Sequence, residues 1–152
     1  MAAVSNYNKK AENKAEKSRD RRIFVVHEHN AKHLHWDFRI EKGNVLKSWA
    51  IPKEPDVVDG EKRLAIMVDD HNLDYAGFEG EIKRGYGKGT VKIWDKGYYE
   101  IESEKKDKIV MHIYGKRLRG EYVLLRFEKA GKNAWLFFRK KSKSKRDDGK
   151  GV

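Results

Sequence analysis

The sequence predicts an all-β protein, a small compact β-barrel of about eight or nine short strands with flexible basic tails at both ends. Three observations support this fold class. Nine short runs rich in β-branched and aromatic residues follow one another at near-regular spacing, connectors that often contain glycine separate them, and 152 residues suffice for one ordinary domain but not for two. The expected strands span residues 23–29, 34–41, 44–51, 63–70, 90–95, 98–102, 108–114, 120–128 and 134–140.

The connectors between these runs indicate how the strands follow one another. Lys42-Gly43-Asn44 and Lys96-Gly97 have the composition of tight hairpin turns, because glycine and asparagine tolerate the backbone angles that such turns require. Residues 130–133 join the last two expected strands in the same way. The glycine-rich stretch 80–90 is expected to be a loop. It lacks the strand–loop–helix context of a phosphate-cradling loop, so no nucleotide site is assigned to it.

Charge divides the chain into three parts. The formal net charge is +11, yet residues 23–138 hold 21 basic and 19 acidic residues and are nearly neutral. The excess positive charge lies in the two ends of the chain. Residues 1–22 contain seven basic and three acidic residues, and residues 139–152 contain seven basic and two acidic residues. We expect a flexible basic arm with a nascent helix around residues 9–17, a barrel domain over residues 23–138 and a disordered basic tail. Basic tails favour a polyanionic partner, although they also serve solubility alone.

Composition excludes several classes of protein. No apolar run approaches the roughly 18 residues that a membrane-spanning helix needs, and the N-terminus lacks the apolar core of a signal peptide. The absence of cysteine excludes disulfides and thiolate metal sites and fits a cytoplasmic protein. Because no apolar surplus indicates an interface, we expect a monomer. Any metal ion must be held by histidine, aspartate or glutamate.

The stretch HNAKHLHWDFRIE (29–41) carries the most specific chemistry. In an extended strand, side chains alternate between two faces, so an apolar stripe faces one way and a polar stripe that includes His35 and Asp37 faces the other. These two residues lie about 7 Å apart along the backbone, close enough for both side chains to reach one ion. A tight turn through residues 30–32 can fold His29 back beside His35. Two imidazoles and a carboxylate suit manganese, iron or zinc, with coordination positions open for a substrate.

Arg39 is the next residue on the same strand face. Its planar fork of N–H donors matches a phosphate, and a divalent cation beside such an arginine suits phosphoryl chemistry better than redox chemistry. A second polar cluster contains His71, which can serve as a charged donor or a general acid, and Tyr75, which can face the same cleft. The alternatives are an exposed polar strand with coincidental histidines and, for His71, a solvated loop.

Four segments carry a family resemblance: FVVHEHNAKHLHWDFRIE (24–41), WAIPK (49–53), KRLAIMVDDHNLDYAGFEGEI (62–82) and YGKGTVKIWDKG (86–97). Together they resemble the 3′-phosphoesterase domain of bacterial and archaeal DNA ligase D, including its free-standing forms. The resemblance covers roughly residues 23–138. It implies a compact β-barrel with a polar cavity on one side, which agrees with the strand pattern.

The resemblance also implies roles for individual residues. Three positions match the family's metal ligands, with manganese (Mn²⁺) as the expected ion: His29, His35 and Asp37. Arg39 and His71 match residues that contact the scissile phosphate, and Tyr75 matches a tyrosine that lines the same site. The expected site therefore combines a metal ion with donors for the phosphate.

Three further residues are expected to contact the substrate. Lys53 and Arg63 match basic residues of the active-site rim. His27 stands where the family often has glutamine, and it shares a strand face with His29, so contact with metal or substrate is expected. The family's N-terminal arm has residue types that recur within residues 1–22 in unmatched spacing, so no role is transferred to them.

The activity that the resemblance implies is stepwise repair of 3′ ends in DNA end joining. A phosphodiesterase step removes a terminal ribonucleoside and leaves a 3′-phosphate, and a phosphomonoesterase step then leaves a 3′-hydroxyl. The implied partners are DNA or DNA–RNA primer-template 3′ ends, together with a separate DNA ligase and polymerase. Two alternative hypotheses remain. One is a non-catalytic nucleic-acid-binding barrel with structural histidines. The other is a metalloenzyme for small molecules, a hypothesis that does not explain the basic tails.

Overall fold

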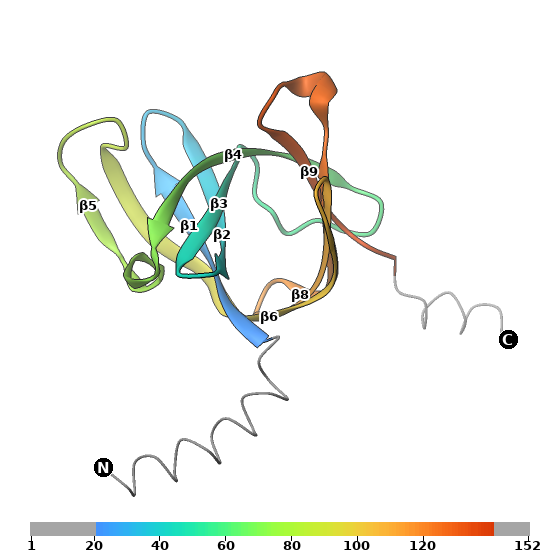
Figure 1. Ribbon diagram of the computed structural model, residues 1–152. Helices are drawn as coiled ribbons and strands as arrows, with labels where there is room; N and C mark the ends of the chain where they lie inside the picture. The colour runs from blue at the N-terminus through green and yellow to red at the C-terminus, as the bar shows by residue number, and fades with distance from the viewer. Residues whose placement is uncertain (1–20, 142–152) are drawn as a thin grey trace, which may run out of the picture.

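A computed structural model describes residues 21–141 (Figure 1). This part of the chain contains nine β-strands and two short 3₁₀ helices. Their bounds are β1 (Arg21–Asn30), β2 (Leu34–Lys42), β3 (Val45–Ile51), β4 (Lys62–Asn72), η1 (Leu73–Gly77), β5 (Gly80–Ile82), β6 (Gly89–Lys105), β7 (Lys108–Tyr114), β8 (Arg119–Arg126), η2 (Glu128–Ala130) and β9 (Ala134–Arg139). The expected helix around residues 9–17, and most of both basic tails, lie outside the described residues. Within residues 21–141, no helix has the length and apolar character needed to cross a membrane.

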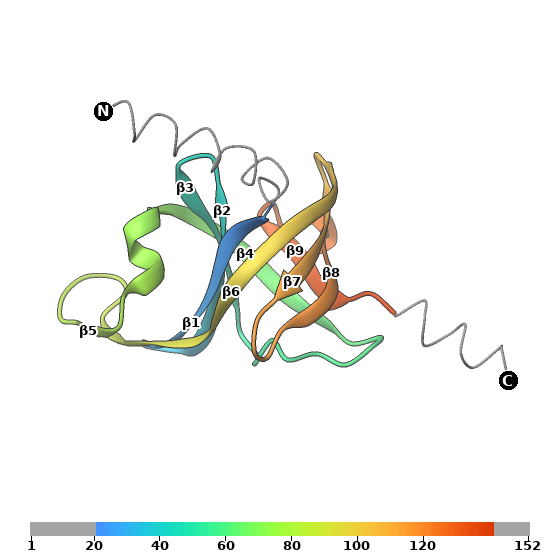
Figure 2. The same ribbon diagram turned by 90° about the horizontal axis from the view of Figure 1, so that it is seen from below.

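Eight antiparallel strands close into a barrel, which confirms the predicted all-β fold. Their order is β1-β2-β3-β4-β9-β8-β7-β6, and pairing between β1 and β6 closes the ring. Figure 2 shows β6 running between β1 and β7 along the barrel wall. The short strand β5 pairs with β6 outside the ring. Closure leaves the eight barrel strands without a free edge along most of their length.

Strand β6 corrects one prediction. The expectation of two strands joined by a hairpin at Lys96-Gly97 is wrong, because Gly89–Lys105 forms one continuous strand. Gly97 lies within the ladder, opposite Phe24 on β1. A Cβ atom at this position would lie 2.1 Å from the carbonyl oxygen of Tyr114. The glycine therefore permits a close approach of neighbouring backbones and does not mark a turn.

The stretch 80–90 is also more regular than the predicted loop. β5 pairs with the first residues of β6, which leaves residues 83–88 as the connection. A three-residue strand is too short to show an alternating pattern, so the sequence gives no signal for it. The other two turns are confirmed. Gly43 has a φ of +65° in the hairpin between β2 and β3, and residues 130–133 lie between β8 and β9.

Gly97→Ala is expected to destabilise the barrel, because the added methyl group would press on the backbone of the neighbouring strand. Overpacking of this kind typically costs about 1–3 kcal/mol, which lowers the melting temperature by several degrees in a small domain. Thermal unfolding followed by circular dichroism measures the effect. Gly43→Asn is the matched control, because nothing lies within 4 Å of a Cβ there and asparagine tolerates the positive φ. Equal melting temperatures of the two variants would contradict this role of Gly97.

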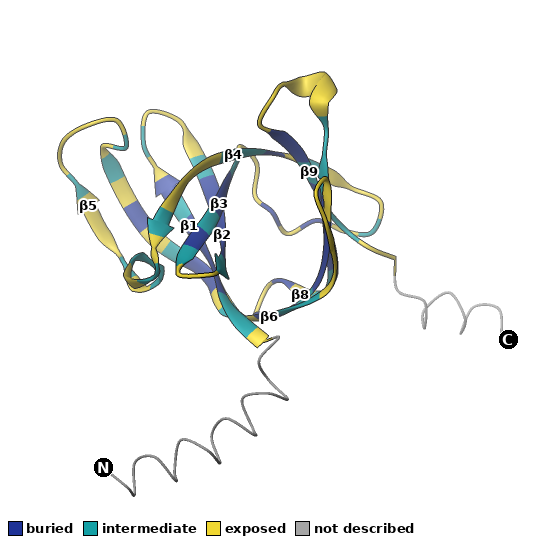
Figure 3. Ribbon diagram, viewed as in Figure 1, coloured by how far each residue is buried: buried dark blue, intermediate teal, exposed yellow. Residues whose placement is uncertain are grey.

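The barrel interior is apolar, and buried residues from all eight barrel strands fill it (Figure 3). Alternation along β2 turns Trp36, Phe38 and Ile40 into this core. The residues between them, Asp37 and Arg39, therefore face outward, yet both are buried. They are buried because η1 and the connection from β5 to β6 pack against this face of the barrel. The fold thus creates a covered polar site on the outside of the barrel wall.

Candidate active site

Cross-strand pairing brings the three expected metal ligands together. β1 and β2 are antiparallel, and their register places His29 directly opposite His35. Asp37 is two residues further along β2 and therefore on the same face. One ligand atom of each residue lies within 4.8 Å of the others. The turn after Asn30 thus folds His29 back beside His35, as the spacing in the sequence predicts.

Two backbone carbonyl groups determine which ring nitrogen of each histidine carries a proton. His29 Nε2 lies 2.7 Å from the carbonyl oxygen of Gly87, and His35 Nδ1 lies 3.0 Å from that of His33. Carbonyl oxygens only accept hydrogen bonds, so both nitrogens donate. The opposite nitrogens of the neutral rings then carry lone pairs, and they lie 3.5 Å (His29 Nδ1) and 3.3 Å (His35 Nε2) from Asp37 Oδ2. Three electron-pair donors therefore face one another, which fits a single bound cation with its ligands oriented by the outer hydrogen bonds.

The electrostatic surroundings favour the charged form of Asp37. Burial opposes ionisation, but the contacts with His29 and His35 and the charge of Arg39 outweigh burial and hold the pKa of this carboxyl well below its usual range. The contact with Asp37 also raises the pKa of His35, against the effect of burial. A proton shared by Asp37 and His35 is a cation, as a metal ion would be. The lowered pKa of Asp37 and the raised pKa of His35 therefore both show that this cluster favours positive charge.

Arg39 is almost fully buried beside the cluster, and four side chains hold it. Its Nε donates to His27 Nδ1 at 3.0 Å, and its Nη2 donates to Asp37 Oδ2 at 3.2 Å. Its Nη1 donates to Ser48 Oγ at 2.9 Å and to His71 Nδ1 at 3.1 Å. A guanidinium has five N–H groups, so one on Nη2 has no partner among the described residues. One N–H of Arg39 therefore remains for a further acceptor.

The contact with Arg39 also sets the protonation of His71. An arginine only donates, so Nδ1 of His71 accepts and the proton of the neutral ring is on Nε2. Burial and the charge of Arg39 lower the pKa of His71 and outweigh the backbone of Asp69 and the nearby carboxylates, which raise it, so the neutral ring is favoured. This geometry favours a neutral His71 with its proton on Nε2. Its role toward a phosphate, as a charged donor or a general acid, stays a prediction.

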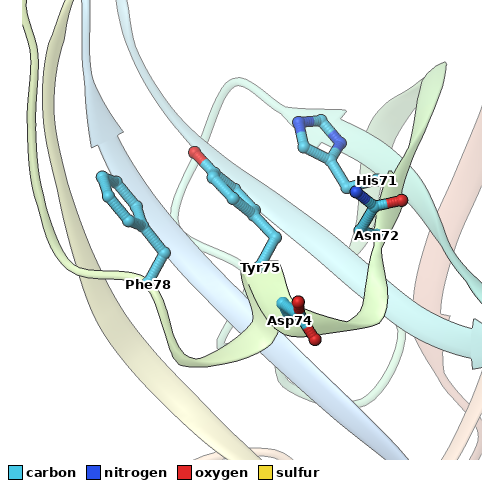
Figure 4. A pocket seen from close by; sticks show the side chains of 5 residues that line it. All are labelled: His71, Asn72, Asp74, Tyr75 and Phe78. Carbon is cyan, nitrogen blue, oxygen red and sulfur yellow. The ribbon is translucent and has the colours of Figure 1, made fainter.

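A shallow pocket opens beside Arg39. It has a volume of about 310 Å³ and is lined by His71, Asn72, Asp74, Tyr75 and Phe78. Figure 4 shows the rings of Phe78, Tyr75 and His71 in a row, and the centroid of Tyr75 lies 5.0 Å from that of Phe78 and 4.6 Å from that of His71. Tyr75 also lies against the guanidinium of Arg39, with 4.9 Å between Cζ and the ring centroid. Tyr75 therefore connects the pocket to the buried donors.

His27 is fully buried beside Arg39. Its Nδ1 accepts the hydrogen bond from Arg39 Nε, and burial together with the charge of Arg39 lowers its pKa to about 4. The ring meets Tyr75 edge-on, with centroids 5.1 Å apart. These contacts place a neutral His27 behind the residues that line the pocket, where it supports Arg39 and Tyr75.

No contact described for residues 21–141 joins Lys53 or Arg63 to this cluster. Lys53 is exposed in the segment after β3. Arg63, near the start of β4, donates to the carbonyl oxygen of Glu54 at 2.9 Å and lies 3.6 Å from the carboxylate of Glu61. Their expected place on the rim of the site stays a prediction.

Sequence reasoning misses two parts of the site. Ser48 anchors Arg39, and its only signal is a small polar residue within the apolar run VLKSWAI (45–51). The carbonyl group of Gly87 has no sequence signal, because every residue has one and only the fold places this one beside His29. Both groups orient residues that the sequence does identify.

Comparisons with known proteins find relatives that match most of the chain. The sequence profile of the DNA Ligase D 3′-phosphoesterase domain matches residues 27–126. The multifunctional non-homologous end joining protein LigD of Pseudomonas aeruginosa is 42% identical over 120 residues, which are 75% of this chain and 14% of that protein. The proteins of the same name from Mycobacterium bovis and Mycolicibacterium smegmatis are 41% identical over 128 residues and 38% identical over 130 residues. These matches cover 81% and 78% of this chain, and 16% and 17% of those proteins.

The chain thus spans only about one-sixth of the length of these relatives. The matched segment nevertheless includes the three ligand candidates and the residues that surround Arg39. On the profile match and these identities, the chain belongs to the family of the DNA ligase D 3′-phosphoesterase domain.

Proposed function

We propose that the chain is a metal-dependent hydrolase that processes the 3′ ends of nucleic acid strands. A phosphodiesterase reaction removes a terminal ribonucleoside, and a phosphomonoesterase reaction then removes the remaining 3′-phosphate. The observation that carries this proposal is the set of lone pairs on His29, His35 and Asp37 that face one another beside the N–H groups of Arg39 and His71. Membership of a phosphoesterase family supports the same reaction class.

The donor set fits a divalent transition metal. His29 would hold it through Nδ1, His35 through Nε2 and Asp37 through Oδ2, with manganese as the first candidate and iron or zinc as alternatives for the same atoms. Such an ion, when bound, polarises a phosphoryl oxygen and offsets its developing charge. The carbonyl groups of His33 and Gly87 hold the two rings with their unprotonated nitrogens facing Asp37, as ligands of such an ion would have to be.

The remaining residues bind and orient the phosphate. The free N–H of Arg39 Nη2 and the Nε2–H of His71 donate to its non-bridging oxygens, and Tyr75 orients it from the pocket. A neutral imidazole is a weak acid, so we assign His71 a hydrogen bond to the phosphate rather than proton donation to the leaving oxygen. Lys53 and Arg63 are proposed to hold the strand at the rim.

The names of the relatives extend the proposal to the biological setting. They describe multifunctional proteins of non-homologous end joining, of which this chain matches one part. We therefore place the substrates among DNA or DNA–RNA primer-template 3′ ends in end joining, with a separate DNA ligase and polymerase as partners.

A single experiment tests the reaction. A 5′-labelled primer-template with one 3′-terminal ribonucleotide is incubated with the protein, with manganese or with chelator, and the products are resolved by length and end group. We expect a 3′-phosphate product first and a 3′-hydroxyl product later, both only with metal. Strand binding that survives chelation without any change of the primer end would instead indicate a non-catalytic nucleic-acid-binding barrel.

His27→Leu is expected to lower kcat by about 10- to 100-fold, because Arg39 Nε loses its acceptor and the guanidinium can turn away from the phosphate. His27→Gln should recover most of the activity, since a side-chain amide oxygen can accept from the same N–H. Steady-state kinetics on a 3′-phosphate strand, with melting temperatures of both variants, measure the effect. Equal activities of the leucine and glutamine variants would contradict a positioning role.

A further inference from the structure

The connection between β5 and β6 has a surface that the proposed reaction does not use. We name residues 83–88, KRGYGK, the basic loop. Tyr86 has a relative exposure of 107% and is the most exposed large hydrophobic residue within the described part of the chain. A large aromatic ring without packing contacts contributes nothing to the stability of the barrel. The ring is therefore free to contact a partner.

All charged side chains of the basic loop are positive and exposed: Lys83, Arg84 and Lys88. Among the ion pairs formed within residues 21–141, none involves these three side chains. The loop thus presents one aromatic ring and three cations to solvent. Their charge is available to an anionic partner.

The basic loop is anchored beside the candidate metal ligands. Gly87 accepts the hydrogen bond from His29 Nε2, and Tyr86 is the residue before it. A Cβ atom at Gly89 would lie 2.1 Å from the carbonyl oxygen of Asn30, so the base of the loop touches the end of β1. Figure 1 shows this loop and the turn between β1 and β2 at the same end of the molecule. A strand end bound at the ligand cluster would therefore pass close to Tyr86.

An exposed aromatic ring among cations suits single-stranded nucleic acid, because rings stack on bases while cations hold the phosphates. A protein surface or a membrane would require a wider apolar patch, whereas Tyr86 is the one large apolar side chain of the basic loop. Gly85 has a φ of +91°, and together with Gly87 it gives the backbone freedom to follow a base.

We propose that Tyr86 stacks on a base of the strand whose 3′ end enters the site, while Lys83, Arg84 and Lys88 bind phosphates of the same strand. This inference rests on the proposed function, because it needs a strand end at the ligand cluster. Every base has a π face, so the contact is tolerant of sequence. The basic loop would then supply affinity for the strand rather than chemistry at the phosphate.

Binding measured in the presence of chelator tests the inference without turnover. The probe is a fluorescent single-stranded DNA that ends in a 3′-phosphate, followed by anisotropy. Tyr86→Ala should weaken binding by about 5- to 100-fold, as expected for loss of one base–aromatic stack, and Tyr86→Trp should bind at least as tightly as the native protein. Tyr98→Ala is the matched control, because Tyr98 is half-exposed on β6 roughly 30 Å along the strand from the loop. It should change the affinity by less than about twofold.

Abasic strands separate stacking from other effects. One base is removed at each of the last three positions in turn. At one of them the native protein should bind more weakly, and Tyr86→Ala should cause no further loss. Arg84→Gln combined with Lys88→Gln should weaken binding and reduce its dependence on salt, because fewer counterions are released.

Equal affinities of Tyr86→Ala and the native protein would overturn the inference, and so would the same loss on every abasic strand. The proposed function fails in a different way. Suppose that no metal supports processing of a primer end, but the loss caused by Tyr86→Ala disappears on one abasic strand. The stacking contact is then supported, and the phosphoesterase activity is contradicted.

Discussion

Replacing Asp37 with alanine is expected to reduce phosphate release from a 3′-phosphate strand by about 100-fold or more. Asp37 contacts both histidines of the ligand cluster, because its Oδ2 lies 3.5 Å from His29 Nδ1 and 3.3 Å from His35 Nε2. The variant retains two neutral imidazoles, which hold a divalent ion more weakly than the complete set. Arg39 also loses the carboxylate that fixes its Nη2, so the donor to the phosphate is displaced as well. The measurement is kcat/KM at saturating manganese.

Metal binding can be followed in the same variant without turnover. A ligand that binds only the folded state raises the melting temperature, so manganese should stabilise the native protein and leave Asp37→Ala unchanged. Asp107→Ala is the matched control, because Asp107 is exposed in the turn between β6 and β7. It should keep both the activity and the metal-induced shift. Turnover by Asp37→Ala within about twofold of the native rate would remove Asp37 from the mechanism.

The part of the site that lies on one strand could be predicted from sequence. Alternation along β2 assigns Asp37 and its neighbours on the outer face, because the strand period of two is local and needs no knowledge of the fold. A short turn then limits where His29 can lie, and the observed register places it opposite His35. Local rules therefore bring the three ligand candidates together.

The parts that could not be predicted depend on contacts between different strands. Ser48 lies opposite Arg39 on the neighbouring strand β3, whereas the carbonyl group of Gly87 reaches His29 across 58 positions of the chain. The wrong prediction of a turn at Gly97 also comes from a contact between strands. Only glycine fits there, because the carbonyl group of Tyr114 on β7 lies so close. Glycine alone cannot distinguish a turn from a close backbone approach. These contacts exist only once the strands have paired in their final register.

Arg39→Lys is expected to lower kcat/KM by about 100-fold or more, although it retains the positive charge. The guanidinium donates in directions set by its plane to four side chains: His27, Asp37, Ser48 and His71. An ammonium group has three donors on a flexible stem and cannot reproduce this arrangement. His71 would lose the donor that fixes its Nε2–H form, and the phosphate would lose a fixed N–H. The loss should therefore exceed that of a variant that removes a single contact.

Comparison with Arg39→Met distinguishes geometry from charge. If the fork of donors matters, the lysine and methionine variants should have activities within about threefold of each other and far below the native protein. Their stabilities should differ, because methionine leaves the buried carboxylate of Asp37 without its cation, at a cost of about 3–5 kcal/mol in the free energy of unfolding. Kinetics and thermal unfolding of both variants measure the two effects independently. Activity of Arg39→Lys within about tenfold of the native value, with Arg39→Met inactive, would mean that charge alone suffices, and the directed hydrogen bonds would then have no catalytic role.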